Sequence, residues 1–110
     1  FIVEGDGTWA VEGIIDFERA FWGDPVAELV AIFLTSDAST EAAFLGGYAA
    51  AGGTPFRFDD SERRRLAAYQ LYVLLLMCIE ATPRAYGPDY AALDTWVRRR
   101  LPVVLTAMSA

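Results

Sequence analysis

With 110 residues, of which 55% are hydrophobic, the chain is too apolar to be disordered and is long enough for one domain with a modest core. Its net charge of −6 argues against nucleic acid as a partner, because nucleic acid is bound through Lys and Arg side chains that neutralise its phosphates. The longest apolar run, Leu71 to Ile79, is far shorter than the roughly 20 residues of a membrane span. Cys78 is the single cysteine, which excludes an internal disulfide and leads us to expect a reducing, cytoplasmic setting.

The first 15 residues predict a β-hairpin. Residues 1–3 are apolar, residues 4–7 contain Asp6-Gly7, and residues 8–15 form a largely apolar return strand. Asp-Gly between two apolar runs favours a tight hairpin turn, because Gly accepts the positive φ that such turns need. An isolated hairpin is at best marginally stable in water, so we expect this one to pack on the helices that follow.

Asp16 comes where the predicted return strand ends. A carboxylate at a strand end can point into a cleft, where it suits a hard cation. Asp24-Pro25 marks a helix start, because the Asp side chain can accept from the first-turn N–H groups and Pro at the first position loses no hydrogen bond. We expect this helix to run to about Ser36, with one apolar face made by Val26, Leu29, Val30 and Phe33.

The next helix is predicted over residues 41–51. Gly46 and Gly47 lie inside it, and their cost of about 1 kcal/mol each relative to Ala suggests the close approach of another backbone. A longer helix follows, to about Glu80, and Asp59 with Glu62 resembles the capping box that would open it. This helix is apolar nearly all round, so we expect it to be buried on several sides at the centre of the helical region.

Arg63, Arg64 and Arg65 lie in the first turns of that long helix. Successive helical residues point about 100° apart, so we expect these three side chains to be solvated separately. The last helix is predicted to start at Asp89 or Tyr90. Pro102 should kink or end it, because proline removes a hydrogen bond and clashes with the preceding turn. The whole pattern predicts an α+β fold, mostly α, with a hairpin and acidic segment over residues 1–24 and about four helices over residues 25–110.

One stretch of this pattern resembles a known family. It reads Ile15-Asp16-Phe17-Glu18-Arg19-Ala20, then Gly23-Asp24-Pro25, then Glu28-Leu29-Val30. In order and spacing it resembles the segment after the catalytic loop in the aminoglycoside phosphotransferase (phosphotransferase enzyme) family, and the likeness covers roughly residues 9–33. That family shares the protein-kinase fold, so the resemblance implies that residues 1–110 are the distal part of a kinase-like large lobe.

The resemblance also implies roles for three acids. Asp16 would be the metal ligand, holding Mg²⁺ that bridges the phosphates of ATP or GTP. Asp24 would be the Asp of the family's Gly-Asp-Pro turn. Glu28 stands where the family often has Asp, an acid that braces the catalytic loop. The implied reaction transfers the γ-phosphoryl group to a hydroxyl of a small molecule.

The family's His-Gly-Asp catalytic loop has no counterpart in this sequence, which contains no His, and all nine of its basic residues are Arg. Phosphoryl transfer needs a group that accepts the proton of the attacking hydroxyl. We therefore expect that loop to precede Phe1 in a larger chain, and the 110 residues alone to be inactive.

Three residues near predicted helix ends are candidates for substrate contact: Glu80, Tyr86 and Asp89. Their acidic or aromatic character, like the acidic net charge, favours a small hydroxylated substrate with positive charge. Glu80 could instead be an ordinary polar helix end, and Asp89 a cap. Two alternatives stay open for the whole chain. The first is a kinase of the same fold that acts on fructosamine, choline-like, homoserine or sugar hydroxyls. The second is a non-catalytic helical module, in which Asp16 would be paired with an Arg or with backbone.

Overall fold

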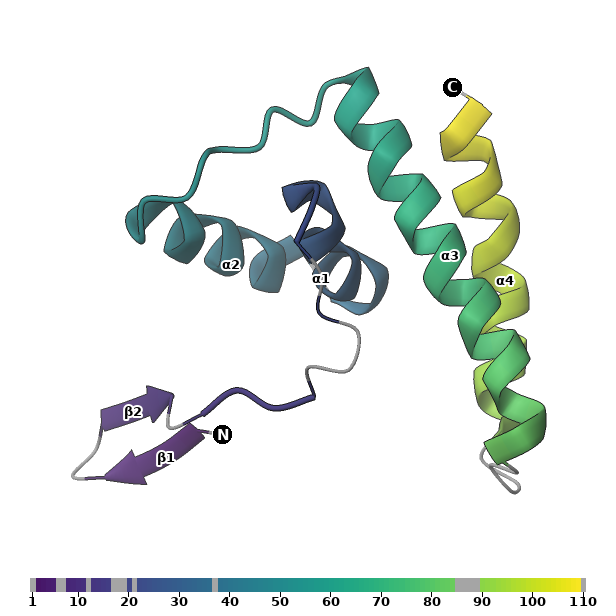
Figure 1. Ribbon diagram of the computed structural model, residues 1–110, viewed down its shortest axis with the longest axis horizontal. Coiled ribbons are helices and arrows are strands. Elements are labelled where there is room, and N and C mark those ends of the chain that lie inside the picture. Colours follow the sequence, from purple (N-terminus) through teal and green to yellow (C-terminus); the bar gives the residue numbers. More distant parts are fainter. Residues whose placement is uncertain are drawn as a thin grey trace.

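The computed structural model describes residues 2–5, 8–11, 13–16, 20, 22–36, 38–84 and 90–109. Two strands, β1 (Ile2–Gly5) and β2 (Thr8–Val11), precede the 3₁₀ helix η2 (Pro25–Glu28) and four α-helices, which are α1 (Leu29–Thr35), α2 (Ala38–Ala50), α3 (Asp60–Arg84) and α4 (Tyr90–Ser109). The described fold is therefore α+β and mostly helical, as the sequence predicts. In Figure 1, α3 and α4 lie side by side and antiparallel, with α1 and α2 on one side of α3.

The predicted hairpin is confirmed, but its second strand is shorter than expected. β1 and β2 pair antiparallel from Ile2 with Val11 to Gly5 with Thr8. Because the first residue of β1 already pairs with Val11, residues 13–16 have no partner strand among the described residues, and they form no regular structure. Asp16 therefore does not lie at the end of a strand.

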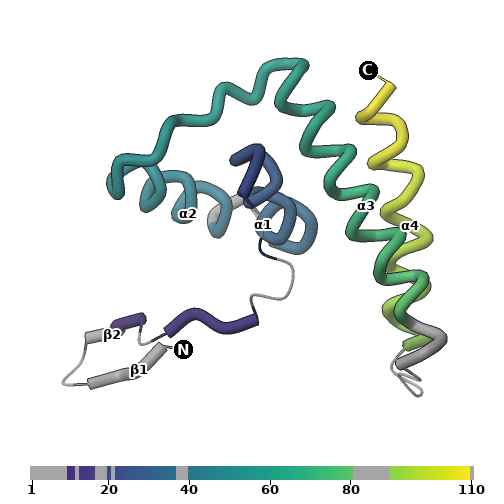
Figure 2. The backbone as a smooth tube through the Cα atoms, in the orientation of Figure 1, coloured from purple at the N-terminus to yellow at the C-terminus, as the bar shows by residue number. Residues whose placement is uncertain are grey.

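The expected packing of the hairpin on the helices is wrong for the described residues. Its strands contact each other and none of the described helices, and Figure 1 shows both strands apart from the helices. Figure 2 traces residues 13–16, which lead from the end of β2 toward the helical region. Val11, Ile14 and Ile15 are accordingly exposed. The radius of gyration of 16.2 Å exceeds the value of about 13 Å expected for a compact chain of this length.

The helix start at Pro25 is confirmed. Asp24 is the N-cap of η2, and its Oδ1 accepts a hydrogen bond from the Val26 N–H at 3.1 Å. The predicted apolar face of this helix is the core of the N-terminal helical region, with Val26, Leu29 and Val30 buried. These three residues pack with Leu66 of α3.

Helix α2 ends at a motif that needs glycine. Gly52 has φ +87°, a left-handed conformation, and its N–H donates to the Ala49 carbonyl, while the Gly53 N–H donates to the Tyr48 carbonyl. These two bonds satisfy carbonyls that a helix end leaves without partners. The close backbone approach predicted at Gly46 and Gly47 is wrong, because a Cβ at either position would meet nothing within 4 Å.

The predicted cap of α3 is confirmed with a change of detail. Asp59 Oδ1 accepts from the Glu62 N–H at 2.9 Å, as in a capping box. The Glu62 carboxylate reaches back further than the usual box, accepting from the N–H groups of Arg57 at 2.7 Å and Phe58 at 2.6 Å. The helix then continues to Arg84, four residues beyond the predicted end.

Helix α3 is buried on two faces and exposed on a third. One face packs with α4 around Leu74 and Val104, which are at most 1% exposed, and another packs with η2 and α1. Tyr72, Leu75 and Ile79 share the remaining face and are 47–67% exposed, so the expected burial does not extend to that face. The apolar composition could not show which face lacks a neighbour.

Helix α4 continues through Pro102 to Ser109, so of the two expected outcomes, a kink or an end of the helix, the end is wrong and the kink stays a prediction. A proline inside a helix costs about 3 kcal/mol, because one hydrogen bond is lost and the ring clashes with the preceding turn. Val97 and Val104, which lie before and after the proline, are 2% and 1% exposed. Their packing in the core with Leu74 holds both halves of α4 against α3. No helix in the described part of the chain is long and apolar enough to cross a membrane.

Candidate functional site

Asp16 lies exposed in the segment 13–16 that follows the hairpin, in an uncommon backbone conformation. Its φ is 72°, in the left-handed region. Asp enters this region more readily than most residues, but at a cost of about 1–3 kcal/mol. No described residue forms a hydrogen bond or ion pair with its carboxylate. Strained residues of this kind cluster at functional sites, where the strain holds a side chain in a required direction.

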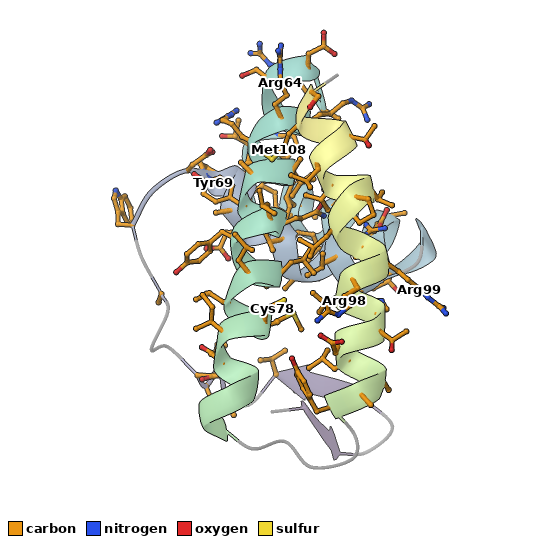
Figure 3. The ribbon with its side chains drawn as sticks, turned by 90° about the vertical axis from the view of Figure 1, so that its right-hand side faces the viewer. Arg64, Tyr69, Cys78, Arg98, Arg99 and Met108 are labelled. Atoms are coloured by element: carbon orange, nitrogen blue, oxygen red, sulfur yellow. The ribbon has the colours of Figure 1, made fainter. Side chains whose placement is uncertain are left out.

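Asp24 is held by three groups at once. Besides its bond to the Val26 N–H, its Oδ2 accepts from Arg65 Nη1 at 2.8 Å and from the Tyr69 hydroxyl at 3.3 Å. Arg65 and Tyr69 are four residues apart on α3 and so lie on the same helix face. In Figure 3, Tyr69 projects from α3 on the side away from α4. The Gly23-Asp24-Pro25 turn is thereby fastened to the longest helix.

The surroundings of Tyr69 favour its neutral form. Burial raises the pKa of Tyr69 above its ordinary value of 10.0, and the negative charge of Asp24 and the hydrogen bond to it act in the same direction. The positive charge of Arg65 opposes them. Tyr69 therefore remains a hydrogen-bond donor to Asp24 at neutral pH.

Glu28 is the last residue of η2, and it is exposed. Together with Trp22 and Asp24 it lines a pocket of about 290 Å³ beside the Gly-Asp-Pro turn. The structure thus brings two of the sequence-predicted acids, Asp24 and Glu28, to one pocket. The bracing role expected for Glu28 remains a prediction.

The predicted substrate residues are not gathered with Asp16. Glu80 is half-buried near the carboxyl end of α3, which Figure 1 shows at the lower right, apart from the segment after the hairpin at the lower left. Tyr86 and Asp89 lie outside the described residues. Substrate contact by any of the three stays a prediction.

Asp16 fits one kind of metal site. Within the described ranges, no group of three or more His, Cys, Asp or Glu residues could hold an ion by itself. A single exposed carboxylate suits Mg²⁺, which is commonly held by one or two carboxylates and takes its other ligands from phosphates and water. Asp16 would supply one ligand of such a site, and its role as a metal ligand stays a prediction.

The contacts of Arg65 and Tyr69 with Asp24 were not predicted. Three separately solvated arginines were expected at the start of α3, but Arg65 pairs with Asp24 and Arg63 Nε donates to the Phe58 carbonyl at 2.5 Å. The spacing of Arg65 and Tyr69 was the available signal, because residues at i and i+4 on a helix can share one acceptor. Nothing in the sequence indicated which acid would be that acceptor.

A comparison with known protein families matches residues 1–69 to the phosphotransferase enzyme family. The match spans more than half of the chain, and it includes Asp16, Asp24, Glu28 and the α3 residues Arg65 and Tyr69. No curated protein and no solved structure matches the chain significantly. The chain, with its exposed Asp16 and its Gly-Asp-Pro turn fastened to α3, belongs to the phosphotransferase enzyme family.

Proposed function

We propose that this chain is part of a small-molecule kinase in which Asp16 holds Mg²⁺ on the phosphates of ATP, and that the γ-phosphoryl group is transferred to a substrate hydroxyl. The observation that carries the proposal is the conformation of Asp16 inside the family match: φ 72°, an exposed carboxylate, and no described partner. A residue that merely terminated a strand would be expected to pair with an Arg or with backbone.

The chemistry that the metal supplies is charge neutralisation on the phosphates during transfer. The chain's own residues position the Asp16 carboxylate and support the segment that carries it. The left-handed backbone at Asp16 sets the direction of its Cα–Cβ bond, and so the side of the segment from which the carboxylate extends. The bonds of Asp24 to Arg65 and Tyr69 fix the turn eight residues further on against α3, so that the connecting segment is anchored at that end.

Phosphoryl transfer also needs a group that receives the proton of the attacking hydroxyl, and further metal ligands. In the proposed enzyme, these groups come from outside the 110 residues. The proposed substrate is a small hydroxylated cation, because the chain carries a net charge of −6. Aminoglycosides belong to that class, and choline-like compounds and fructosamines are further candidates.

The test is turnover by the complete protein with ATP and Mg²⁺ on a panel of aminoglycoside, fructosamine, choline and homoserine substrates. Asp16→Asn keeps the size of the side chain and tolerates the left-handed backbone, but it removes the charge. We expect it to lower kcat by about 100-fold or more, since a lost metal ligand costs several kcal/mol of transition-state stabilisation. The matched control is Asp60→Asn, which changes an exposed Asp in the first turn of α3.

Two readouts separate the metal role from a fold defect. The circular dichroism of Asp16→Asn should equal that of the unchanged protein, and its KM for Mg²⁺ should rise while that of Asp60→Asn does not. Full turnover in Asp16→Asn would overturn the metal assignment. Turnover lost in both variants alike would show a general effect of charge.

A further inference from the structure

A second cavity lies at the end of the α3–α4 pair where α3 begins and α4 ends. Its volume is about 330 Å³, at the lower end of the range for small-molecule sites. Apolar walls come from three separate parts of the chain: Phe33 of α1, Phe58 of the connection before α3, and Ala107 of α4. In Figure 3 this end of the pair is marked by Arg64 on α3 and Met108 on α4. The cavity shares no lining residue with the pocket beside Asp24 and Glu28.

Gln70 lines this cavity and places a polar group on its wall. It is a buried polar residue of α3, with only 7% of its surface exposed, and its amide hydrogen-bonds no described residue. The amide offers two N–H donors and a carbonyl acceptor. Among the described residues the solvent-excluded side-chain atom without a partner is Arg100 Nε, so the Gln70 amide keeps access to the open cavity. An amide placed on the wall of a cavity is therefore suited to a ligand that hydrogen-bonds to it.

The walls beside Gln70 indicate the shape of that ligand. The rings of Phe33 and Phe58 lie with their centroids 5.4 Å apart. Leu66 and Ala67 of α3 add buried aliphatic surface. Aromatic rings gain most from flat apolar partners, which stack on their faces or meet their edges. The cavity thus favours a planar ring of modest size.

The charged residues at the mouth indicate the sign of the ligand's charge. Arg63 and Arg64 line it together with Asp60. Each arginine uses its Nε for a backbone carbonyl, that of Phe58 at 2.5 Å and that of Asp60 at 3.2 Å, and so keeps its terminal amino groups for other acceptors. Two guanidinium groups against one carboxylate leave a positive mouth. Guanidinium groups bind carboxylates with two parallel hydrogen bonds.

We propose that this cavity binds a small planar aromatic carboxylate that also carries a hydrogen-bonding group on its ring. The ring lies against the Phe33–Phe58 pair on one side and the α3 wall on the other, its polar group bonds to the Gln70 amide, and its carboxylate meets Arg63 and Arg64. The site is independent of the proposed phosphoryl transfer, because none of its residues is one of the acids assigned to that reaction.

The test is calorimetric titration of the complete protein with three probes. Indoleacetate has both the ring N–H and the carboxylate, naphthylacetate lacks the ring N–H, and tryptamine replaces the carboxylate by an ammonium group. We expect indoleacetate to bind, and tryptamine to bind at least about tenfold more weakly. Equal affinity for indoleacetate and tryptamine, or no binding of any probe below millimolar concentration, would overturn the proposal.

Variants locate the site. Gln70→Leu should lower the affinity ratio of indoleacetate to naphthylacetate by about tenfold, because one hydrogen bond is lost for the first probe only. Arg64→Gln should weaken both carboxylates, whereas Arg99→Gln, which changes an exposed arginine lower on α4, should weaken neither. Ala107→Trp should block all binding. An unchanged ratio in Gln70→Leu, or binding retained in Ala107→Trp, would place the ligand elsewhere.

One measurement needs no variant and so does not depend on how the variants fold. In nitrogen-15 NMR spectra of the unchanged protein, the side-chain amide of Gln70 should shift on addition of indoleacetate and shift less on addition of naphthylacetate. An amide signal that stays in place at saturating indoleacetate would contradict the proposed contact.

Discussion

The guanidinium of Arg65 donates to the carboxylate of Asp24 at 2.8 Å, across 41 residues of sequence. This contact connects the Gly-Asp-Pro turn, which follows the proposed metal residue, to the longest helix of the chain. The Asp24 side chain is 17% exposed and that of Arg65 is 46% exposed, so the pair lies at the edge of the core. Ion pairs at such partly exposed positions typically contribute no more than about 1 kcal/mol to stability.

Replacing Asp24 should show how much this anchor is worth. Asp24→Ala removes a helix cap, an ion pair and a tyrosine hydrogen bond, and we expect it to lower the free energy of unfolding by about 2 kcal/mol. Asp94→Ala is the control, because Asp94 pairs with Arg98 on α4 at i,i+4 and its loss should cost less than about 1 kcal/mol. The measurement is urea denaturation of both variants, and equal costs would show that the anchor adds nothing beyond a surface pair.

Tyr69 gives the same cluster a signature in alkaline solution. Its folded-state pKa is raised above 10.0 by burial, by Asp24 and by the hydrogen bond between them. The folded protein thus holds the Tyr69 proton more tightly than the unfolded chain does. The resulting stability is complete below a pH of about 10 and is lost as pH rises through the folded-state pKa.

Ultraviolet absorbance of the phenolate measures this titration, with Tyr69→Phe identifying the Tyr69 component by difference. Asp24→Asn should lower the midpoint of Tyr69 toward 10.0, whereas Arg65→Gln should raise it further, because Arg65 is the group that opposes the shift. A midpoint that moves in the same direction in both variants would contradict the assignment of these charges.

Arg100 forms a second long-range contact, at the end of α1. Its Nη2 donates to the Phe33 carbonyl at 3.3 Å, a carbonyl in the last turn of α1, while its Nε is buried and has no partner among the described residues. We expect Arg100→Ala to lower the free energy of unfolding by about 1–3 kcal/mol, because a helix-end carbonyl loses its donor and side-chain packing is lost.

The neighbouring residue provides the control for that prediction. Arg99 is exposed and projects away from α3 in Figure 3, so Arg99→Ala should change stability by no more than about 0.5 kcal/mol. Thermal denaturation of the two variants compares them directly. If both melt at the same temperature, the contact between Arg100 and Phe33 does not stabilise the end of α1.

Pro102 should be a site where substitution stabilises the protein. It is exposed and lies inside α4, where it removes one helical hydrogen bond. Pro102→Ala restores a backbone donor and removes the clash with the preceding turn, so we expect a gain of up to about 3 kcal/mol. Val103→Ala, at an exposed neighbouring position, should give no gain. A Pro102→Ala variant that melts below the unchanged protein would show that α4 needs the proline in its native geometry.

Local hydrogen-bond chemistry made several elements of this protein predictable from the sequence. Asp24 before Pro25 predicts a helix start, because the cap and the first-turn proline act over three residues. Asp59 and Glu62 predict the start of α3 for the same reason, and Asp6-Gly7 predicts the hairpin. The segment around Asp16 and Asp24 also identified the family, because its residues are contiguous in sequence.

Only the tertiary structure decided which surfaces meet. The sequence showed that α3 is apolar nearly all round, but the positions of η2, α1 and α4 decide that Leu74 is buried and Ile79 exposed. The length of β2 depends on where β1 begins, and the acceptor for Arg65 lies 41 residues away. Gln70 faces a cavity because three separate segments of the chain surround it. Caps and turns are settled by neighbours along the chain, whereas burial and long-range pairing depend on segments that only the folded chain brings together.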